Sequence, residues 1–295
     1  MTDAVPGAPP GAVVVAGPPA TPFRAFAGLL RRDLRVQAHN VFEFLVRTLM
    51  QPVLFVFVFT YLFPKIGQGF SVAVGATGGA SGAAPAAHGV TFATILVPGL
   101  VGIGAVFAGI TTVALPLSVE FGATNEIEDR IMAPLPAWAV GFEKIVYGAL
   151  NGLISAVIVF PLVYLVPATP VSVHVGNWPL LIGVIAIACL TSGALGLALG
   201  SWVQPQKIGL LFGVLVLPLS FLGCVYYPWA RLGAVRWLQV IVLVNPIVYV
   251  NEGLRAALTP GIQHMPAWAF LGGSALFCAT LLVAGLRLFM RRVVT

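Results

Sequence analysis

Charged residues are scarce in this chain of 295 residues, and their scarcity excludes a soluble protein. Only 8% of the residues are Asp, Glu, Lys or Arg, whereas 59% are hydrophobic and the mean hydropathy is +1.00. Soluble domains carry roughly 25% charged residues, so this chain lacks the charge that a water-facing surface needs. Its apolar residues form long continuous runs, unlike the short alternating segments of a membrane β-barrel. The sequence therefore predicts an all-α integral membrane protein.

Catalytic and metal-binding motifs are also lacking. The three cysteines, Cys189, Cys224 and Cys278, form no close pair and no metal-binding spacing. The sequence contains no GxxxxGK(S/T) phosphate-binding loop, no HExxH and no GxSxG. The four histidines are scattered and lie mostly in expected loops. We therefore expect that this chain is not an enzyme and holds no metal, cofactor or ATP of its own.

Six apolar segments are expected to be transmembrane helices. They lie at about 41–63, 91–116, 138–166, 178–200, 208–222 and 267–289. The Pro-, Gly- and Ala-rich residues 1–22 are expected to form a disordered cytoplasmic tail, residues 23–40 an interfacial helix, and residues 41–295 one transmembrane domain. Placing both termini in the cytoplasm puts about eleven of the 15 Lys and Arg residues inside. Since Ala, Val, Gly and Arg abound while Lys is scarce, we expect a multi-pass protein of a bacterial inner membrane.

Residues 23–40 combine an apolar stripe with basic side chains. Phe23, Phe26, Leu30 and Leu34 recur at helical spacing. The basic residues around that stripe are Arg24, Arg31, Arg32 and Arg35. An amphipathic helix of this kind suits the surface of a bilayer. A positively charged flank of the first span explains the pattern equally well.

The segment between the second and third spans, residues 118–136, is acidic although it is expected to be cytoplasmic. Its charged residues are Glu120, Glu126, Glu128, Asp129 and Arg130. Residues 125–132 have helical spacing, and Pro134 ends that helix. A short acidic helix fits a groove on a partner protein. A solvated helix cap is the simpler alternative.

Residues 221–258 interrupt the apolar C-terminal half with prolines, aromatic residues and arginines. A broken backbone inside a membrane must be hydrogen-bonded or line a wet cavity. We therefore expect a re-entrant segment that covers an outer vestibule between spans five and six, with an amphipathic loop resting on lipid as the alternative. Its candidate residues are Tyr227, Pro228, Trp237, Asn245, Pro246, Glu252 and Arg255. Glu252 and Arg255 lie three residues apart and are expected to pair on a helix.

A substrate path is harder to predict from the sequence. The candidates for a path or gate are Phe55, Phe59, Phe107, Thr111, Leu217, Leu219 and Phe221. Contact with lipid or with neighbouring helices explains the same residues. No acid or base lies deep in an apolar span, which disfavours an ion-coupled carrier. Three GxxxG pairs, Gly148/Gly152, Gly196/Gly200 and Gly209/Gly213, predict close helix packing within one bundle or across a dimer face.

The order of motifs before the last span resembles that of ABC-2 type export permeases. The matching residues are Tyr227-Pro228, Trp237-Leu238-Gln239, Asn245-Pro246 and Leu254-Arg255. The acidic segment is similar to the coupling loop of that family at Glu120, Gly122, Thr124 and Pro134, although Ala123 separates the Gly from the Thr. The resemblance covers nearly the whole chain beyond residue 20. It is closest to the bacterial drug-export branch, which includes daunorubicin-resistance permeases.

The resemblance implies a permease subunit of an ATP-binding-cassette exporter that moves a hydrophobic or amphipathic substrate, such as a drug, a lipid or a secondary metabolite. It implies a second permease subunit, identical or paralogous, and two P-loop ATPase subunits that bind ATP and Mg²⁺. Membrane lipid is an expected partner and nucleic acid is not. The acidic loop and the N-terminal helix would transmit ATPase closure to the membrane. The alternatives are export of a polysaccharide or lipid-linked glycan by the same fold, an ion-coupled carrier, and a membrane anchor without transport.

Overall fold

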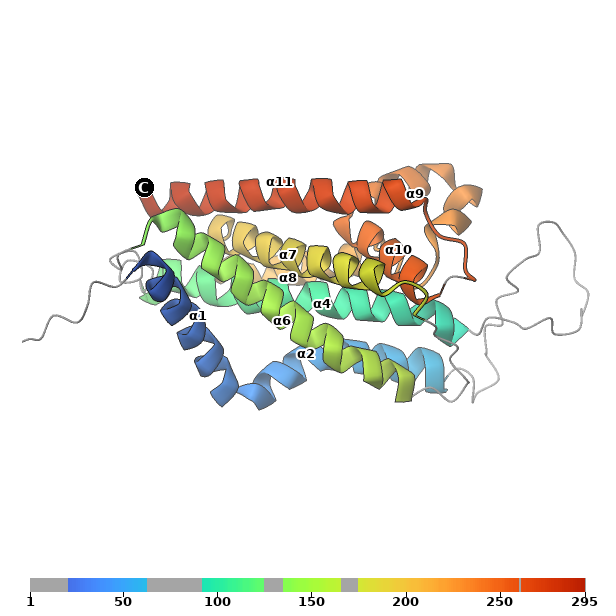
Figure 1. Cartoon of the computed structure of the whole chain (residues 1–295), viewed down its shortest axis with the longest axis horizontal. Helices are drawn as coiled ribbons and strands as arrows, with labels where there is room; N and C mark the ends of the chain where they lie inside the picture. The colour runs from blue at the N-terminus through green and yellow to red at the C-terminus, as the bar shows by residue number, and fades with distance from the viewer. Residues whose placement is uncertain (1–20, 63–91, 125–134, 166–174, 260, 295) are drawn as a thin grey trace, which may run out of the picture.

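A computed structural model describes residues 21–62, 92–124, 135–165, 175–259 and 261–294 (Figure 1). All regular secondary structure in these residues is helical, as the apolar runs predict. The expected tail and the acidic helix at 125–132 lie outside the described residues, so they stay predictions.

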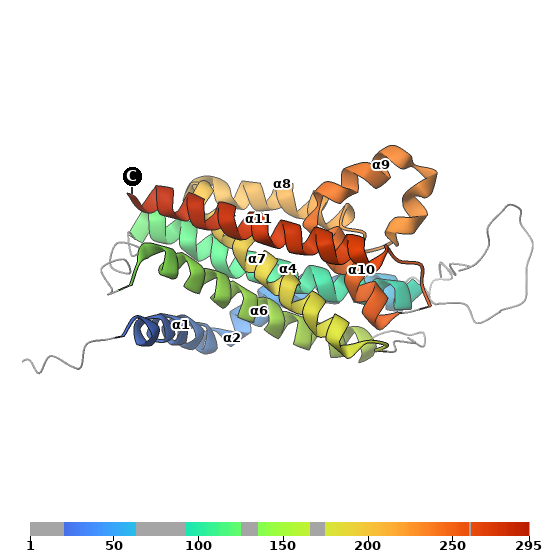
Figure 2. The same cartoon turned by 45° about the horizontal axis from the view of Figure 1, so that its top comes forward.

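Four long apolar helices run side by side and form the body of the molecule (Figures 1 and 2). They are α4 (Phe92–Val119), α6 (Ala137–Leu165), α7 (Trp178–Trp202) and α11 (Ala267–Val294). Each is long and apolar enough to cross a membrane. Their bounds agree closely with the predicted second, third, fourth and sixth spans.

The centre of the bundle is α4. Within its most apolar stretch 83% of the residues are buried, against 22% in α11, which faces outward. A Cβ atom added to Gly148, Gly152, Gly196 or Gly200 would lie only 2.6–3.0 Å from a neighbouring helix of the same chain. These two GxxxG pairs therefore pack within one bundle. The third pair, Gly209 and Gly213, has no atom within 4 Å of an added Cβ atom.

The first and fifth predicted spans are represented by shorter helices. The first contains α2 (Val41–Val56), which continues into the π-helix η1 (Phe57–Leu62). The fifth is α8 (Pro205–Phe221). The described residues thus contain four helices that fulfil the requirements for a span, or five if the bent pair described next counts as one. The prediction of six spans is confirmed only to that extent.

The segment after α8 is broken, as its Asn-Pro pair predicts. The 3₁₀-helix η3 (Trp229–Ala234) leads to α9 (Arg236–Ile241), η4 (Val242–Val244) and α10 (Pro246–Leu258). The chain bends by 100° between Val244 and Pro246. Asn245 stabilises the bend, because its Oδ1 accepts a hydrogen bond from Ile247 N at 3.0 Å and its Nδ2 donates to Leu219 O at 3.0 Å. The predicted interruption is confirmed as a bent helix pair.

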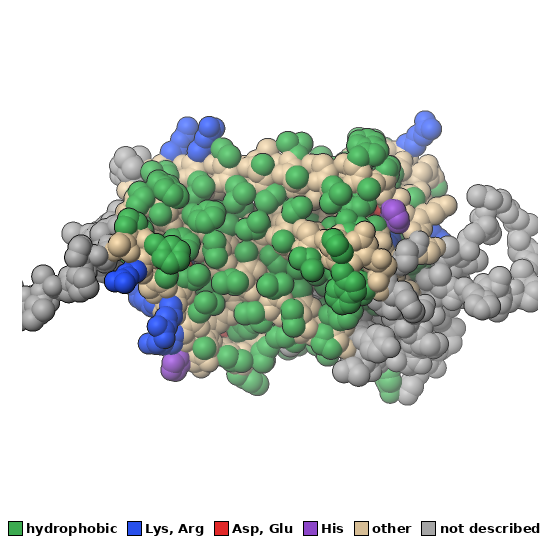
Figure 3. Space-filling model, in the orientation of Figure 1, with side chains coloured by type: hydrophobic (Ala, Val, Ile, Leu, Met, Phe, Trp, Pro, Cys, Tyr) green, Lys and Arg blue, Asp and Glu red, His purple; other side chains and the backbone are tan. Residues whose placement is uncertain are grey.

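The two ends of the bundle are built from different elements. One end gathers α1 (Pro22–His39), the π-helix η2 (Glu120–Thr124), the turn from α7 to α8, and the end of α11 (Figures 1 and 2). The opposite end carries η3, α9 and the start of α11. Hydrophobic side chains cover the middle of the face shown in Figure 3, and Lys and Arg side chains lie towards its two ends. We call the end of the bundle that contains α1 the α1 end, and the end that contains η3 and α9 the α9 end.

Candidate functional site

A buried group of charged side chains joins three elements at the α1 end. Lys144, in the second turn of α6, donates from Nζ to Asp33 Oδ2 of α1 at 2.9 Å and to Glu120 Oε1 of η2 at 3.1 Å. The side chains of Lys144, Asp33 and Glu120 are only 4%, 8% and 9% exposed. We call these three residues the Lys144 cluster. Because removal of charges from water is costly, such a cluster holds together only while its members pair.

A second polar contact between α1 and α6 lies one turn further along both helices. Tyr147 donates its hydroxyl to Gln37 Oε1 at 2.7 Å, and Gln37 Nε2 in turn donates to Asn151 Oδ1. Asn151 Nδ2 donates to the carbonyl of Tyr147 at 2.8 Å. Helix α1 corresponds to the amphipathic helix predicted at 23–40. It contacts α6 through polar residues at two successive turns.

The arginines predicted to mark the interfacial helix lie on its outer side. Arg24, Arg31, Arg32 and Arg35 are all exposed, whereas Asp33 on the opposite side is buried. Sequence reasoning missed Asp33 and Gln37 as contact residues. Their signal was present, because both share a helix face with Phe26 and Leu30.

The structure describes only the first part of the segment predicted to couple the chain to an ATPase, up to Thr124. Glu120 belongs to the Lys144 cluster, and Gly122 lies against Pro205, the first residue of α8, so closely that an added Cβ atom would overlap the proline ring. Thr124 is the last residue of η2. The other members of the prediction, Glu126, Glu128, Asp129 and Arg130, lie outside the described residues.

A buried ion pair organises the bent segment near the α9 end. Glu252 and Arg255 of α10 are both fully buried and are paired as predicted. The Glu252 carboxylate also accepts from Trp229 N at 2.9 Å and from Met265 N at 2.8 Å. Arg255 donates from Nη2 to Cys224 O at 3.0 Å. One ion pair therefore ties α10 to the turn after α8, to η3 and to the loop before α11.

The remaining candidates of this segment have simpler roles. Tyr227 donates its hydroxyl to the carbonyl of Phe221 at 2.7 Å, which closes the turn after α8. Pro228 precedes η3, and Pro246 occupies the first turn of α10, where a helix tolerates proline. Trp237 is exposed, as an aromatic residue at a membrane interface can be.

A comparison with known families decides what this arrangement belongs to. Residues 24–259, from the start of α1 to the end of α10, match the ABC-2 type transporter family. The chain belongs to the ABC-2 type transporter family. It is a multi-pass integral membrane protein and a permease component of an ABC-2 type transporter, a family that lacks the ATPase domain and generally pairs with an ABC ATPase. No curated protein matches the chain at a significant level.

The predicted path residues of this ABC-2 permease are not gathered in one place. Phe107 is buried inside the bundle, and Thr111 donates its hydroxyl back to Phe107 O at 2.9 Å. Phe55 and Phe221 both lie beside the ring of Tyr226, with ring centroids 5.5 Å apart in each case. The side chains of Phe59 and Leu217 lie outside the described part of the chain, so their roles stay predictions.

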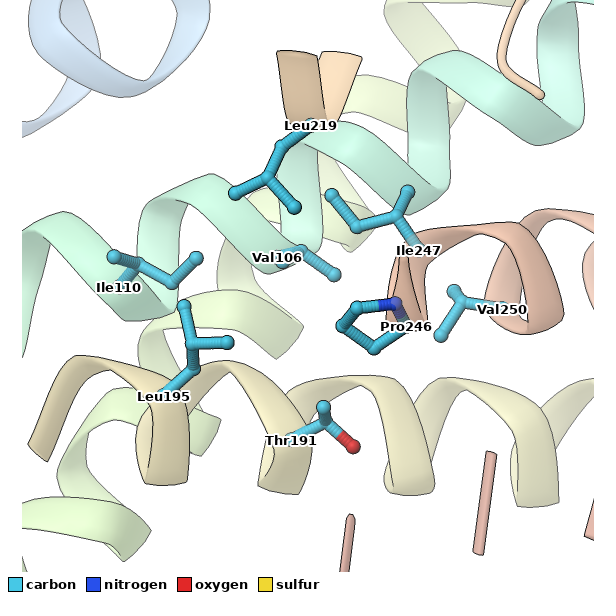
Figure 4. A pocket seen from close by; sticks show the side chains of 8 residues that line it. All are labelled: Val106, Ile110, Thr191, Leu195, Leu219, Pro246, Ile247 and Val250. Carbon is cyan, nitrogen blue, oxygen red and sulfur yellow. The ribbon is translucent and has the colours of Figure 1, made fainter. Parts of the chain in front are cut away.

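One cavity inside the described part of the permease subunit is very small, whereas an apolar hollow of about 340 Å³ lies between α6 and α7. Apolar side chains of four helices converge on a cavity of only about 10 Å³ (Figure 4). Its lining residues are Val106, Ile110, Thr191, Leu195, Leu219, Pro246, Ile247 and Val250. A cavity of this size has room for about one water molecule, and its largely apolar lining offers such a molecule few hydrogen-bond partners. Of the path candidates whose side chains the structure describes, Leu219 lines this cavity, which is too small for a transported molecule.

Proposed function

We propose that this ABC-2 permease is the membrane half of an exporter that moves a hydrophobic or amphipathic substrate with ATP hydrolysed by a separate subunit. The Lys144 cluster is the observation that carries the proposal. It connects α1 and η2, which resemble the ATPase-contacting parts of the family, to α6, the predicted third span. Since the three side chains are buried and paired, a displacement of η2 is passed to both helices.

The proposed motion starts in the acidic loop that follows η2. Closure of the ATPase pair pushes on residues 125–132, and η2 is continuous with that loop and with α4. Glu120 then carries Lys144 and Asp33 with it, so α1 and α6 move as one body. The bent pair at the α9 end opens the outer exit.

The substrate cavity, in this proposal, lies between two permease subunits. Support comes from the small size of the cavity among α4, α7, α8 and α10 and from the exposed face of α8, which packs on α4. Leu210 and Val214 are 74% and 66% exposed, and Gly209 and Gly213 beside them are open. This face suits close approach of a second copy or of a paralogue.

The chemistry of that face supports an apolar substrate. From Ile208 to the end of α8 at Phe221, the exposed side chains that the structure describes are apolar. A polysaccharide path would favour polar and aromatic side chains, so export of a drug, lipid or secondary metabolite is the better proposal. A drug-resistance role follows the resemblance to the drug-export branch.

The topology is proposed to have six spans with both termini in the cytoplasm of a bacterial cell. The continuous helix from Val41 to Leu62 serves as the first span and α8 as the fifth. The exposed arginines of α1 and the two arginines in the last turn of α11 lie at the same end of the bundle, which supports placing that end inside.

The double substitution Glu126→Lys with Glu128→Lys tests the coupling role of the acidic loop. We expect the amount of ATPase recovered per permease in a mild-detergent pull-down to fall several-fold, because an acidic contact becomes basic. The matched control is Glu43→Lys, which reverses an exposed charge on α2. Normal ATPase recovery with the double variant would contradict the coupling role.

A further inference from the structure

We propose that Arg292, in the last turn of α11, is a positioning residue that joins η2 to the turn between α7 and α8. Through this connection α8 moves with η2 (Glu120–Thr124), which we call the coupling segment, and passes the motion to the bent pair. The inference rests on the proposed function and adds to it a route across the membrane.

Arg292 holds the end of α7. Its Nη1 donates to the carbonyls of Gly200 at 3.2 Å, Ser201 at 2.8 Å and Val203 at 3.1 Å. These are terminal carbonyls of α7, which have no partner within the helix. A cation at this position also opposes the negative end of the helix dipole. The turn that starts α8 is therefore fixed to the end of α11.

The same guanidinium group contacts η2. Its central carbon lies 4.5 Å from the ring centroid of Phe121, a distance at which a cation is attracted to an aromatic face. Phe121 meets Phe289 of α11 edge to face, with ring centroids 5.7 Å apart. Phe289 is fully buried one turn before Arg292. One side chain thus contacts the coupling segment and the end of α7 at once.

A second contact connects η2 to α8 on the other side of the turn. Gly122 of η2 is packed so tightly on the ring of Pro205 that only a glycine fits there. Gly122 therefore contacts one flank of the turn at residues 202–205 directly, and Phe121 reaches the other flank through Arg292. A displacement of η2 cannot leave the start of α8 in place, because neither contact has free space.

The far end of α8 reaches the bent pair. The carbonyl of Leu219 accepts a hydrogen bond from Asn245 Nδ2, the residue at the bend, at 3.0 Å. Between its two ends α8 packs on α4, while Leu210 and Val214 are exposed. A helix that is held at both ends and has exposed residues between them is suited to transmit an axial displacement.

The test is the accessibility of one outer residue in two nucleotide states. The permease, purified with its co-purifying ATPase, carries Ala234→Cys in η3, where Ala234 is exposed. The native cysteines are buried. The modification rate with a membrane-impermeant maleimide is compared between ADP and ATP with vanadate. With Arg292→Gln we expect the ratio of the two modification rates to approach one. The difference between the nucleotide states should thus shrink by about 2- to 30-fold, the range for residues in a coupled network.

A structural role alone would not produce this result, because the ratio compares two states of one variant. Arg287→Gln is the matched control, since Arg287 is an exposed arginine of the same helix, and its ratio should equal that of the parent. Phe121→Leu should lower the ratio as Arg292→Gln does, and the double variant should lose no more than either alone. Arg292→Lys, which keeps the charge and a donor, should recover part of the ratio.

Parent-like ratios in both Arg292→Gln and Phe121→Leu would overturn the proposal. If Arg292→Gln fails to fold, Phe121→Leu decides, because it leaves the carbonyl contacts of α7 intact. A parent protein that carries no ATPase, or whose ratio is one, would contradict the proposed function and this route with it. A nucleotide-dependent parent with an insensitive Phe121→Leu variant would contradict the route alone.

Discussion

Replacement of Lys144 by methionine should destabilise the permease strongly. Methionine keeps the apolar stem of the side chain but removes the ammonium group. Two buried carboxylates, those of Asp33 and Glu120, then lose the cation that both contact. Breaking a buried pair by removing one partner costs about 3–5 kcal/mol. At about 2–4 °C per kcal/mol, the midpoint of thermal unfolding should fall by about 6–20 °C.

The assay is thermal unfolding of the tagged protein in mild detergent, followed by size-exclusion chromatography of the fraction that stays monodisperse. The matched control is Lys207→Met, the same substitution at an exposed lysine of α8, which should shift the midpoint by about 2 °C or less. The triple variant with Asp33→Asn and Glu120→Gln removes all charges of the cluster. It should recover much of the loss, because a neutral buried group costs less than a buried carboxylate that has lost its ammonium partner.

Equal midpoints for Lys144→Met and Lys207→Met would refute the reasoning, since the cluster would then contribute no more than a surface lysine. A triple variant no more stable than Lys144→Met would show that the loss comes from packing and not from the two buried carboxylates.

Two further substitutions test the packing of the outer segment and of the bundle. Glu252→Gln should accelerate maleimide modification of the buried Cys224 several-fold, because Arg255 loses its ion pair and the turn after α8 opens more often; an unchanged rate would contradict this role of the pair. Gly193→Ala should lower stability by about 1–3 kcal/mol, since the new Cβ atom would overlap the backbone of α6. Gly183→Ala on the same helix, with no atom within 4 Å, should be neutral or stabilising by up to about 1 kcal/mol, and an equal loss in both would exclude close packing as the cause.

Features set by a local stretch of sequence could be predicted. A run of some 25 apolar residues has few alternatives to a membrane-length helix, which is why α4, α6, α7 and α11 lie close to where they were expected. The break at Asn245 agrees with the Asn-Pro pair, since Asn245 caps α10 and Pro246 occupies its first turn, whereas Pro218 lies inside α8 without ending it. Glu252 and Arg255 pair because three residues bring side chains together on a helix.

Features set by residues far apart in the chain could not be predicted. Lys144 meets Asp33 across 111 positions, and Arg292 meets Ser201 across 91. Nothing local in the sequence specifies which helix end lies beside which, so these partners become visible only once the helices are packed. The same limit explains why the predicted path residues are not gathered in one place. Aromatic and hydroxylic residues on an apolar helix look alike whether they line a cavity or, like Phe107, fill the core.

The most direct test of the central claim is a mild-detergent pull-down of the tagged permease from its native host, with the co-purifying chains identified and quantified. The account predicts a P-loop ATPase in near-equal amount to the permease. It also predicts that Lys144→Met lowers that amount while the protein still inserts into the membrane, because α1 and η2 are no longer held together. Reproducible absence of any ATPase from the parent preparation would contradict the account.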